Sequence, residues 1–172
     1  MNVTAWAAAA VGLIACITDL KARRIPNALT LGAAAAALLF RGLTSGPEAL
    51  AMAAAGWVIG VLIFLPLFLL RGIGGGDVKL LAALGAWVGP GLVVWVALWA
   101  AIAGGVLALA LSVWRGYTRQ AFTNVWGLLS YWRVMGVRPH PTLTLDAKSP
   151  AAPRLPYALP LTAGLGLALW LQ

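Results

Sequence analysis

Residues 92–114 read LVVWVALWAAIAGGVLALALSVW, 23 positions without a charged side chain. A helix that crosses a bilayer needs about 20 consecutive apolar residues, so this stretch predicts a transmembrane helix. Five further apolar runs, separated by short charged or glycine- and proline-rich breaks, lie at residues 3–18, 28–43, 50–70, 78–88 and 155–171. If each run crosses once, the chain is an all-α, polytopic membrane bundle of about six transmembrane helices. The run at 78–88 reaches only about 16 Å of a hydrocarbon core of about 30 Å, so we expect it to start earlier, to tilt or to cross a thinned bilayer.

The composition of the whole chain agrees with a membrane protein. Of 172 residues, 62% are hydrophobic and 9% are charged, and the mean hydropathy is +0.93, whereas soluble domains carry about 25% charged residues. These values exclude a soluble globular protein and a disordered chain, and the length favours a single membrane domain over residues 1–172. With a lone Cys16 and a lone His140, no disulfide framework, metal site or cofactor is expected.

The basic residues predict the partner and the orientation. The net charge of +8 comes from 12 Lys and Arg against 4 Asp and Glu. The basic residues lie in the breaks between apolar runs, which favours anionic membrane lipid over nucleic acid as a partner. In the six-helix arrangement, one side of the membrane holds only Arg41, and the other side holds Lys21, Arg23, Arg24, Arg71, Lys79, Arg115, Arg119, Arg133, Arg138, Lys148 and Arg154. Because cytoplasmic loops retain Lys and Arg, the crowded side is predicted to be cytoplasmic, with both termini outside. Arg41 is expected to snorkel to the outer interface.

The long connection at 115–154 contains a helical pattern of its own. Phe122, Val125, Trp126 and Leu129 recur at helical spacing, while polar residues fall mostly on the other side. We therefore predict an amphipathic helix over about 119–136 that lies on the cytoplasmic leaflet. A seventh crossing over 121–137 is the competing interpretation. A proline-rich linker follows.

Two of the four acidic residues stand where an apolar run meets the predicted cytoplasmic interface. Asp19 ends the first run and Asp77 precedes the fourth, so both are expected at the same depth on the same side. An ionisable group at that depth is costly and is a candidate functional group. Structural roles are also open: Asp19 can pair with a basic residue three to five positions on, and Asp77 can cap the following helix. Glu48, His140 and Asp146 are predicted to be loop residues.

The sequence beside each aspartate favours a functional role. Asp77 follows three glycines, which suit a backbone that leaves the helix and approaches a substrate closely. Pro26, after Asp19, ends one element and sets up the next. Two carboxylates, one from each break, can therefore face each other across the bundle. Such a pair shares a proton, so one carboxylate serves as general base toward water and the other as general acid toward a carbonyl.

This pairing predicts peptide hydrolysis without a metal or a nucleophilic side chain. Two other function classes are open. In a small proton-coupled membrane transporter, the same two aspartates would form a proton relay, although both lie at one interface. In a non-catalytic subunit of a secretion machine, both aspartates would tolerate replacement by Asn.

At these residues the chain resembles the type IV prepilin peptidases, membrane aspartic proteases with a GxGD motif, and in particular their short branch that serves Tad or Flp-type pili. The matching stretches are Asp19-Leu20-Lys21-Ala22-Arg23-Arg24-Ile25-Pro26-Asn27 and Gly74-Gly75-Gly76-Asp77-Val78-Lys79-Leu80, followed by Gly85 and Gly89. Pro156-Tyr157 is similar to the Pro-Tyr-Gly of the family, with Ala158 in place of the glycine.

The resemblance implies that Asp19 and Asp77 are the catalytic pair of an endopeptidase in the bacterial inner membrane. It implies cleavage of the basic leader from a prepilin or pseudopilin precursor at the cytoplasmic face, with a surrounding motif of Gly74, Gly75, Gly76, Pro26, Asn27 and Lys79. Lys79 is expected either to stabilise the Asp77 carboxylate or to anchor its helix at the interface. Longer members carry a cysteine-rich zinc-binding insert and also methylate the new N-terminus. This chain has a single cysteine, which leaves methyltransferase activity open, and the oligomeric state is not predicted.

Overall fold

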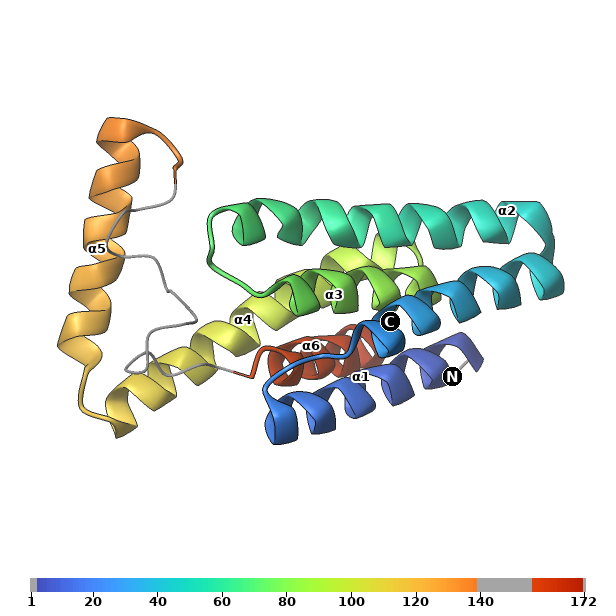
Figure 1. Ribbon diagram of the computed structural model, residues 1–172, viewed down its shortest axis with the longest axis horizontal. Coiled ribbons are helices and arrows are strands. Elements are labelled where there is room, and N and C mark those ends of the chain that lie inside the picture. The colour runs from blue at the N-terminus through green and yellow to red at the C-terminus, as the bar shows by residue number, and fades with distance from the viewer. Residues whose placement is uncertain (1–2, 139–155, 172) are drawn as a thin grey trace.

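The computed structural model describes residues 3–138 and 156–171, and every regular element in this part of the chain is an α-helix. The helices are α1 (Val3–Ala22), α2 (Asn27–Leu69), α3 (Gly75–Val88), α4 (Pro90–Trp114), α5 (Thr118–Met135) and α6 (Ala158–Trp170). All except α5 run along one common direction (Figure 1). The predicted all-α helix bundle is confirmed.

α2 is a helical hairpin whose two arms correspond to the second and third predicted crossings. Gly46 has φ +83° and ψ −173°, a conformation that costs glycine little, and Pro47 opens the second arm, where its missing N–H is not needed. Figure 1 shows the two arms running in opposite directions. The connection is shorter than expected: Glu48 lies in the first turn of the second arm, so its prediction as a loop residue is wrong.

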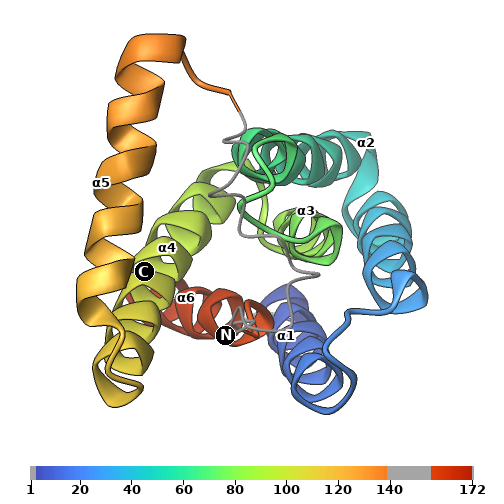
Figure 2. The same cartoon turned by 60° about the vertical axis from the view of Figure 1, so that its left-hand side comes forward.

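α3 occupies the centre of the bundle, where α1, α2, α4 and α6 enclose it (Figure 2). Its side chains from Leu80 to Trp87 are all buried. The helix begins at Gly75, three residues before the apolar run that predicted it, and its 14 residues reach about 21 Å. Because neighbouring helices rather than lipid cover α3, its length does not have to match the full thickness of a bilayer.

Small side chains line the helix interfaces. The buried stripe of α1 contains, at spacings of three and four residues, Ala5, Ala8, Gly12, Ala15 and Asp19. Large apolar side chains of the same helix, Leu13 and Ile17 among them, are exposed. This arrangement is typical of helices that pack against each other inside a membrane. Of the helices described, α1, α2 and α4 are long and apolar enough to cross one.

α6 packs against both α1 and α4. Thr162 Oγ1 donates a hydrogen bond of 2.9 Å to Gly12 O on α1. On the other side, a Cβ at Gly164 would lie only 2.5 Å from Ala100 N of α4. Because α1 and α6 run in opposite directions (Figure 1), these contacts place the first turn of α6 beside the last turn of α1.

The two ends of the bundle differ. The end that holds Asp19 and Asp77, called the aspartate end below, is also where α1, α2 and α4 finish, so the basic residues that follow these helices gather there (Figure 1). The opposite end holds Arg41, whose Nη2 donates a hydrogen bond of 2.6 Å to Trp87 O near the end of α3. The partly buried guanidinium thus binds a carbonyl at the C-terminus of α3, where the helix dipole favours a positive charge. The expected snorkelling of Arg41 to the outer interface stays a prediction.

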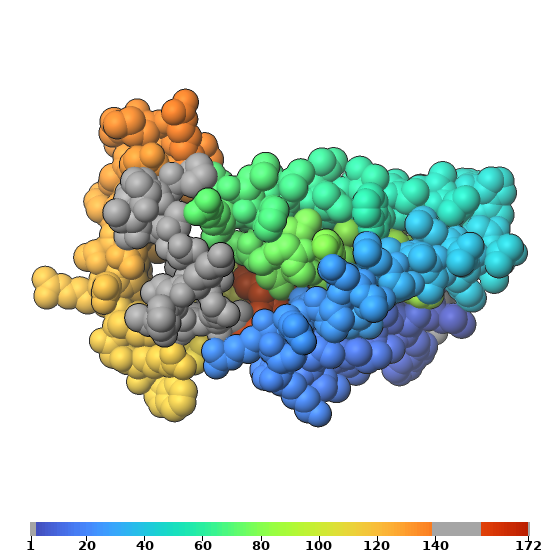
Figure 3. Space-filling view, viewed as in Figure 1, coloured from blue at the N-terminus to red at the C-terminus, as the bar shows by residue number. Residues whose placement is uncertain are grey.

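α5 lies across the aspartate end of the bundle, and its bounds are close to the predicted 119–136 (Figures 1 and 2). Figure 3 shows it at one edge of the molecule. This orientation differs from the seventh crossing over 121–137 that the sequence left open, and α5 is not among the helices apolar enough to cross a membrane. The predicted linker, with His140 and Asp146, lies outside the described residues.

Candidate active site

Asp19 faces the interior because it continues the buried stripe of α1. It follows Ala15 by four residues, about one helical turn, and only 9% of its surface is exposed. Arg23 ends the helix: it has a φ of +50°, and its N–H donates a hydrogen bond of 2.8 Å to Asp19 O. The Asp19 carboxylate is therefore held in the last turn of α1, at the aspartate end.

Asp77 is the third residue of α3 and is half-buried. Gly74 N donates to Asp77 Oδ2 across 3.1 Å, and Asp77 N donates to Gly74 O across 3.1 Å. The first of these bonds is one half of a capping box, since Gly74 has no side chain to form the other half, and it orients the Asp77 carboxylate and satisfies the backbone N–H of the N-cap residue. Asp77 thus takes part in capping, as the sequence allowed, but from the third helical position, with Gly74 as the N-cap.

The start of α6 is a third part of the site. Ala158 N donates a hydrogen bond of 3.3 Å to Asp19 Oδ2, and both residues are buried. The preceding residue, Tyr157, packs its ring edge-on against Phe64 of α2, with 6.0 Å between the centroids, and interacts electrostatically with Asp77. Neither residue was among the predicted site residues. Tyr157 could have been found from the similarity of Pro156-Tyr157 to the family motif. The backbone N–H of Ala158 could not, because its role does not depend on the side chain.

The two predicted aspartates lie at the same end of the bundle, Asp19 in the last turn of α1 and Asp77 in the first turn of α3. Their side chains lie close enough for their charges to interact. In the described part of the chain neither forms an ion pair, and Lys21, Arg23 and Arg24 are exposed, so the expected structural pairing of Asp19 is not found. Two carboxylates near each other and largely out of water cannot both ionise easily, and such a pair can hold one proton between them.

The glycine run before Asp77 is more helical than the sequence indicated. Gly74 is the N-cap, whereas Gly75 and Gly76 form the first turn of α3, and none of the three has a positive φ. They lie against other segments: a Cβ at Gly76 would come within 3.3 Å of Ile25 Cβ, and one at Gly75 within 3.3 Å of the Phe68 ring. The expectation that all three glycines form a break in the helix is therefore wrong, and close packing explains Gly75 and Gly76.

Lys79 links the two motif segments. Its Nζ donates a hydrogen bond of 2.9 Å to Oδ1 of Asn27, the first residue of α2, across 52 residues of sequence. Pro26 is the N-cap of α2, and its carbonyl accepts from Leu29 N and Thr30 N. Lys79 therefore ties the start of α3 to the start of α2 and makes no ion pair with Asp77 within the described residues.

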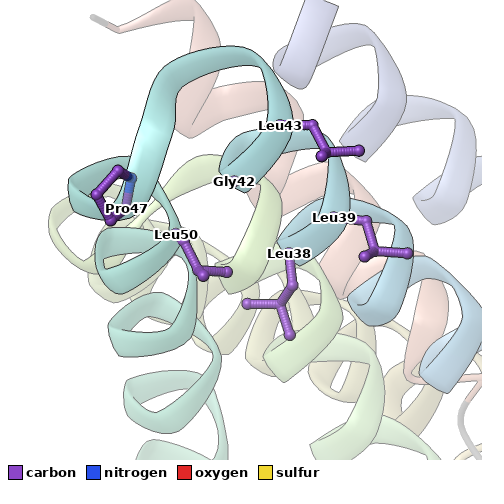
Figure 4. A pocket seen from close by; sticks show the side chains of 6 residues that line it. All are labelled: Leu38, Leu39, Gly42, Leu43, Pro47 and Leu50. Atoms are coloured by element: carbon purple, nitrogen blue, oxygen red, sulfur yellow. The ribbon is translucent and has the colours of Figure 1, made fainter.

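A groove of 380 Å³ lies at the turn of α2 (Figure 4). This turn is at the opposite end of the bundle from the start of α3 (Figure 1). The lining of the groove is apolar: Leu38, Leu39, Gly42, Leu43, Pro47 and Leu50. It offers no catalytic group. Within residues 3–138 and 156–171, no group of three or more His, Cys, Asp or Glu side chains is placed to hold a metal ion.

Most of the bundle matches a known protein family. The type IV leader peptidase family matches residues 6–109, a stretch that contains both Asp19 and Asp77. The chain belongs to this family. The chain is also similar to two curated proteins, each called "Prepilin leader peptidase/N-methyltransferase", from Burkholderia pseudomallei strains 1026b and K96243.

The match to these relatives is partial. Each is 40% identical to the chain over 124 residues, which cover 66% of this chain and 40% of the relative. No solved structure matches this leader peptidase family member.

Proposed function

We propose that this leader peptidase family member is a membrane aspartic endopeptidase with Asp19 and Asp77 as its catalytic pair. The observation that carries the proposal is the placement of these two carboxylates, from α1 and α3, at one end of the bundle. The substrate is a type IV prepilin-like precursor of the Tad or Flp type, cut at the basic leader. Both the name of the relatives and the motif resemblance support this substrate class.

The two carboxylates have different roles in the proposed reaction. With one proton shared between them, the ionised carboxylate takes a proton from a water molecule, and the resulting nucleophile attacks the scissile carbonyl carbon. The protonated carboxyl donates its proton toward the carbonyl oxygen, which stabilises the charge that develops there. The carboxyl that took the proton from water then donates it to the nitrogen of the scissile bond, the C–N bond breaks, and the leader separates from the new N-terminus. A hydroxyl of the tetrahedral intermediate returns its proton to the other carboxylate as the new carboxyl group forms, so the pair again holds one proton.

The site lies at a membrane interface in this proposal. The basic residues that gather at the aspartate end support a cytoplasmic location of that end in the inner membrane. Because the leader of the substrate is also basic, overall charge attraction does not drive recognition. Instead, the apolar helix of the substrate docks laterally among the crossing helices by close packing.

The test is a mobility-shift assay of a co-expressed prepilin-like substrate with the wild type, Asp19→Asn and Asp77→Asn. Glu48→Gln is the matched control, because Glu48 is an exposed carboxylate at the opposite end of the bundle. Each variant is quantified in the membrane fraction, so that a folding defect is not mistaken for a catalytic one. Mass spectrometry of the mature N-terminus reads out methylation in the same samples.

The expected result is loss of processing in both Asn variants and normal processing with Glu48→Gln. Full processing by either Asn variant at wild-type abundance would refute the catalytic pair. Proton flux into liposomes that contain the protein would then support the transporter alternative.

A further inference from the structure

α5 presents an apolar face that no described part of the chain covers. The face consists, at helical spacings of three and four residues, of Phe122, Val125, Trp126 and Leu129. Their exposed fractions are 64%, 56%, 74% and 53%, and no residue of α5 is buried. Four large apolar side chains in contact with water would be unfavourable, so this face requires an apolar environment.

Arginines border the apolar face. Arg119, Trp126 and Arg133 follow each other at intervals of seven residues and therefore form one row along α5, and both arginines are exposed. The polar side chains lie outside this face: Gln120, Thr123, Asn124 and Ser130, with Leu128, Tyr131, Val134 and Met135 among them. An apolar stripe with arginines at its edge is typical of helices that lie in the interface of an anionic bilayer, where the guanidinium groups reach the phosphates.

The position of α5 agrees with such a surface. α4 is long and apolar enough to cross a membrane, it ends at Trp114, and α5 begins at Thr118. Gly116, with a φ of +73°, allows the sharp change of direction between them. Figure 1 shows that α5 then runs across the bundle axis, so it lies at the level where α4 leaves the bilayer. Its packing within the described residues is against the end of α4, which leaves the apolar face free.

We propose that α5 binds the headgroup region of an anionic bilayer, with the face of Phe122, Val125, Trp126 and Leu129 inserted at the upper acyl chains and with Arg119 and Arg133 at lipid phosphates. This binding holds the aspartate end of the bundle at the membrane surface. It goes beyond the proposed peptidase function and does not depend on it.

The test uses the full chain, reconstituted in vesicles that contain phosphatidylglycerol. In a Cys16→Ala background, a single cysteine at Val125→Cys carries an environment-sensitive fluorophore on the apolar face. Thr123→Cys is the matched control outside the apolar face in the same turn. Quenching is measured with lipids brominated near the headgroup, with lipids brominated near the end of the acyl chain, and with iodide in the water.

The expected result is quenching of the probe at 125 by shallow bromine and of the probe at 123 by iodide. Iodide access to both probes would overturn the proposal, because α5 would then lie off the membrane. Quenching of both by deep bromine would also overturn it, in favour of a crossing helix. In vesicles of phosphatidylcholine alone, or with Arg119→Gln and Arg133→Gln together, shallow quenching at 125 is expected to decrease. Unchanged quenching in both would overturn the role of anionic lipid.

Discussion

Gly56 on the second arm of α2 and Gly85 on α3 pack backbone against backbone: a Cβ on either residue would collide with the carbonyl oxygen of the other. One turn along, a Cβ at Gly60 would lie 2.7 Å from Ala82 Cα. The two helices therefore meet without side chains between them. This contact places α3, and with it Asp77, in the middle of the bundle.

Substitution at this crossing is expected to destabilise the protein. Gly85→Ala forces the helices apart or strains them, at a cost of about 1–3 kcal/mol in the free energy of unfolding. Thermal unfolding in detergent micelles measures the effect. Gly105→Ala is the control, because nothing lies within 4 Å of a Cβ there and an alanine inside a helix is favoured by about 0.5–1 kcal/mol. Equal stability of the two variants would contradict close packing at Gly85.

The Lys79–Asn27 hydrogen bond is expected to support catalysis because it fixes the start of α3, which carries Asp77, relative to the start of α2. Lys79→Met and Asn27→Ala should each slow substrate processing about fivefold, equivalent to about 1 kcal/mol. The double variant should be no slower than either single one, because both remove the same bond. Lys21→Met is the control, since Lys21 is exposed and has no hydrogen-bond partner within the described residues. Additive effects of the two substitutions would show that the residues act separately.

The hydroxyl group of Tyr157 lies beside Gly104 of α4 and within electrostatic range of Asp77, and it is expected to influence that carboxylate. Tyr157→Phe keeps the ring that packs against Phe64 and removes only the oxygen, so processing should fall about fivefold to tenfold while the melting temperature stays unchanged. Tyr117→Phe, at the turn between α4 and α5, provides a matched control. A lowered melting temperature with the same fall in processing would mean that the hydroxyl serves stability instead.

Arg41 is expected to contribute to stability and not to chemistry. Arg41→Met removes the hydrogen bond to Trp87 O and the positive charge at the C-terminus of α3, which should cost about 1.5–3 kcal/mol in the free energy of unfolding. Processing per folded molecule should stay at the wild-type level, because Arg41 binds Trp87 O near the C-terminus of α3, whereas Asp77 is in the first turn of that helix. Arg24→Met, at an exposed position, gives the reference for loss of a charge without a bond. A fall in processing at unchanged stability would contradict this assignment.

The apolar helices and the two candidate carboxylates were predictable from the amino-acid sequence. The runs at 28–43 and 50–70 predicted both arms of α2, because the apolar length of a segment is a local property. Asp19 and Asp77 stood out because a charge is costly beside such segments. The helical spacing within α5 was also readable from its residues alone.

The central position of α3 and the hydrogen-bond partners of each carboxylate depend on contacts between segments that are distant in the sequence. Gly75 and Gly76 pack closely against Phe68 and Ile25, which come from other segments, and the sequence does not show those neighbours. Asp19 accepts a hydrogen bond from Ala158 N, 139 residues away. Every residue except proline carries such an N–H, so no side-chain pattern marks the one that meets a carboxylate. The packing of α6 against α1 brings the N–H of Ala158 to the Asp19 carboxylate.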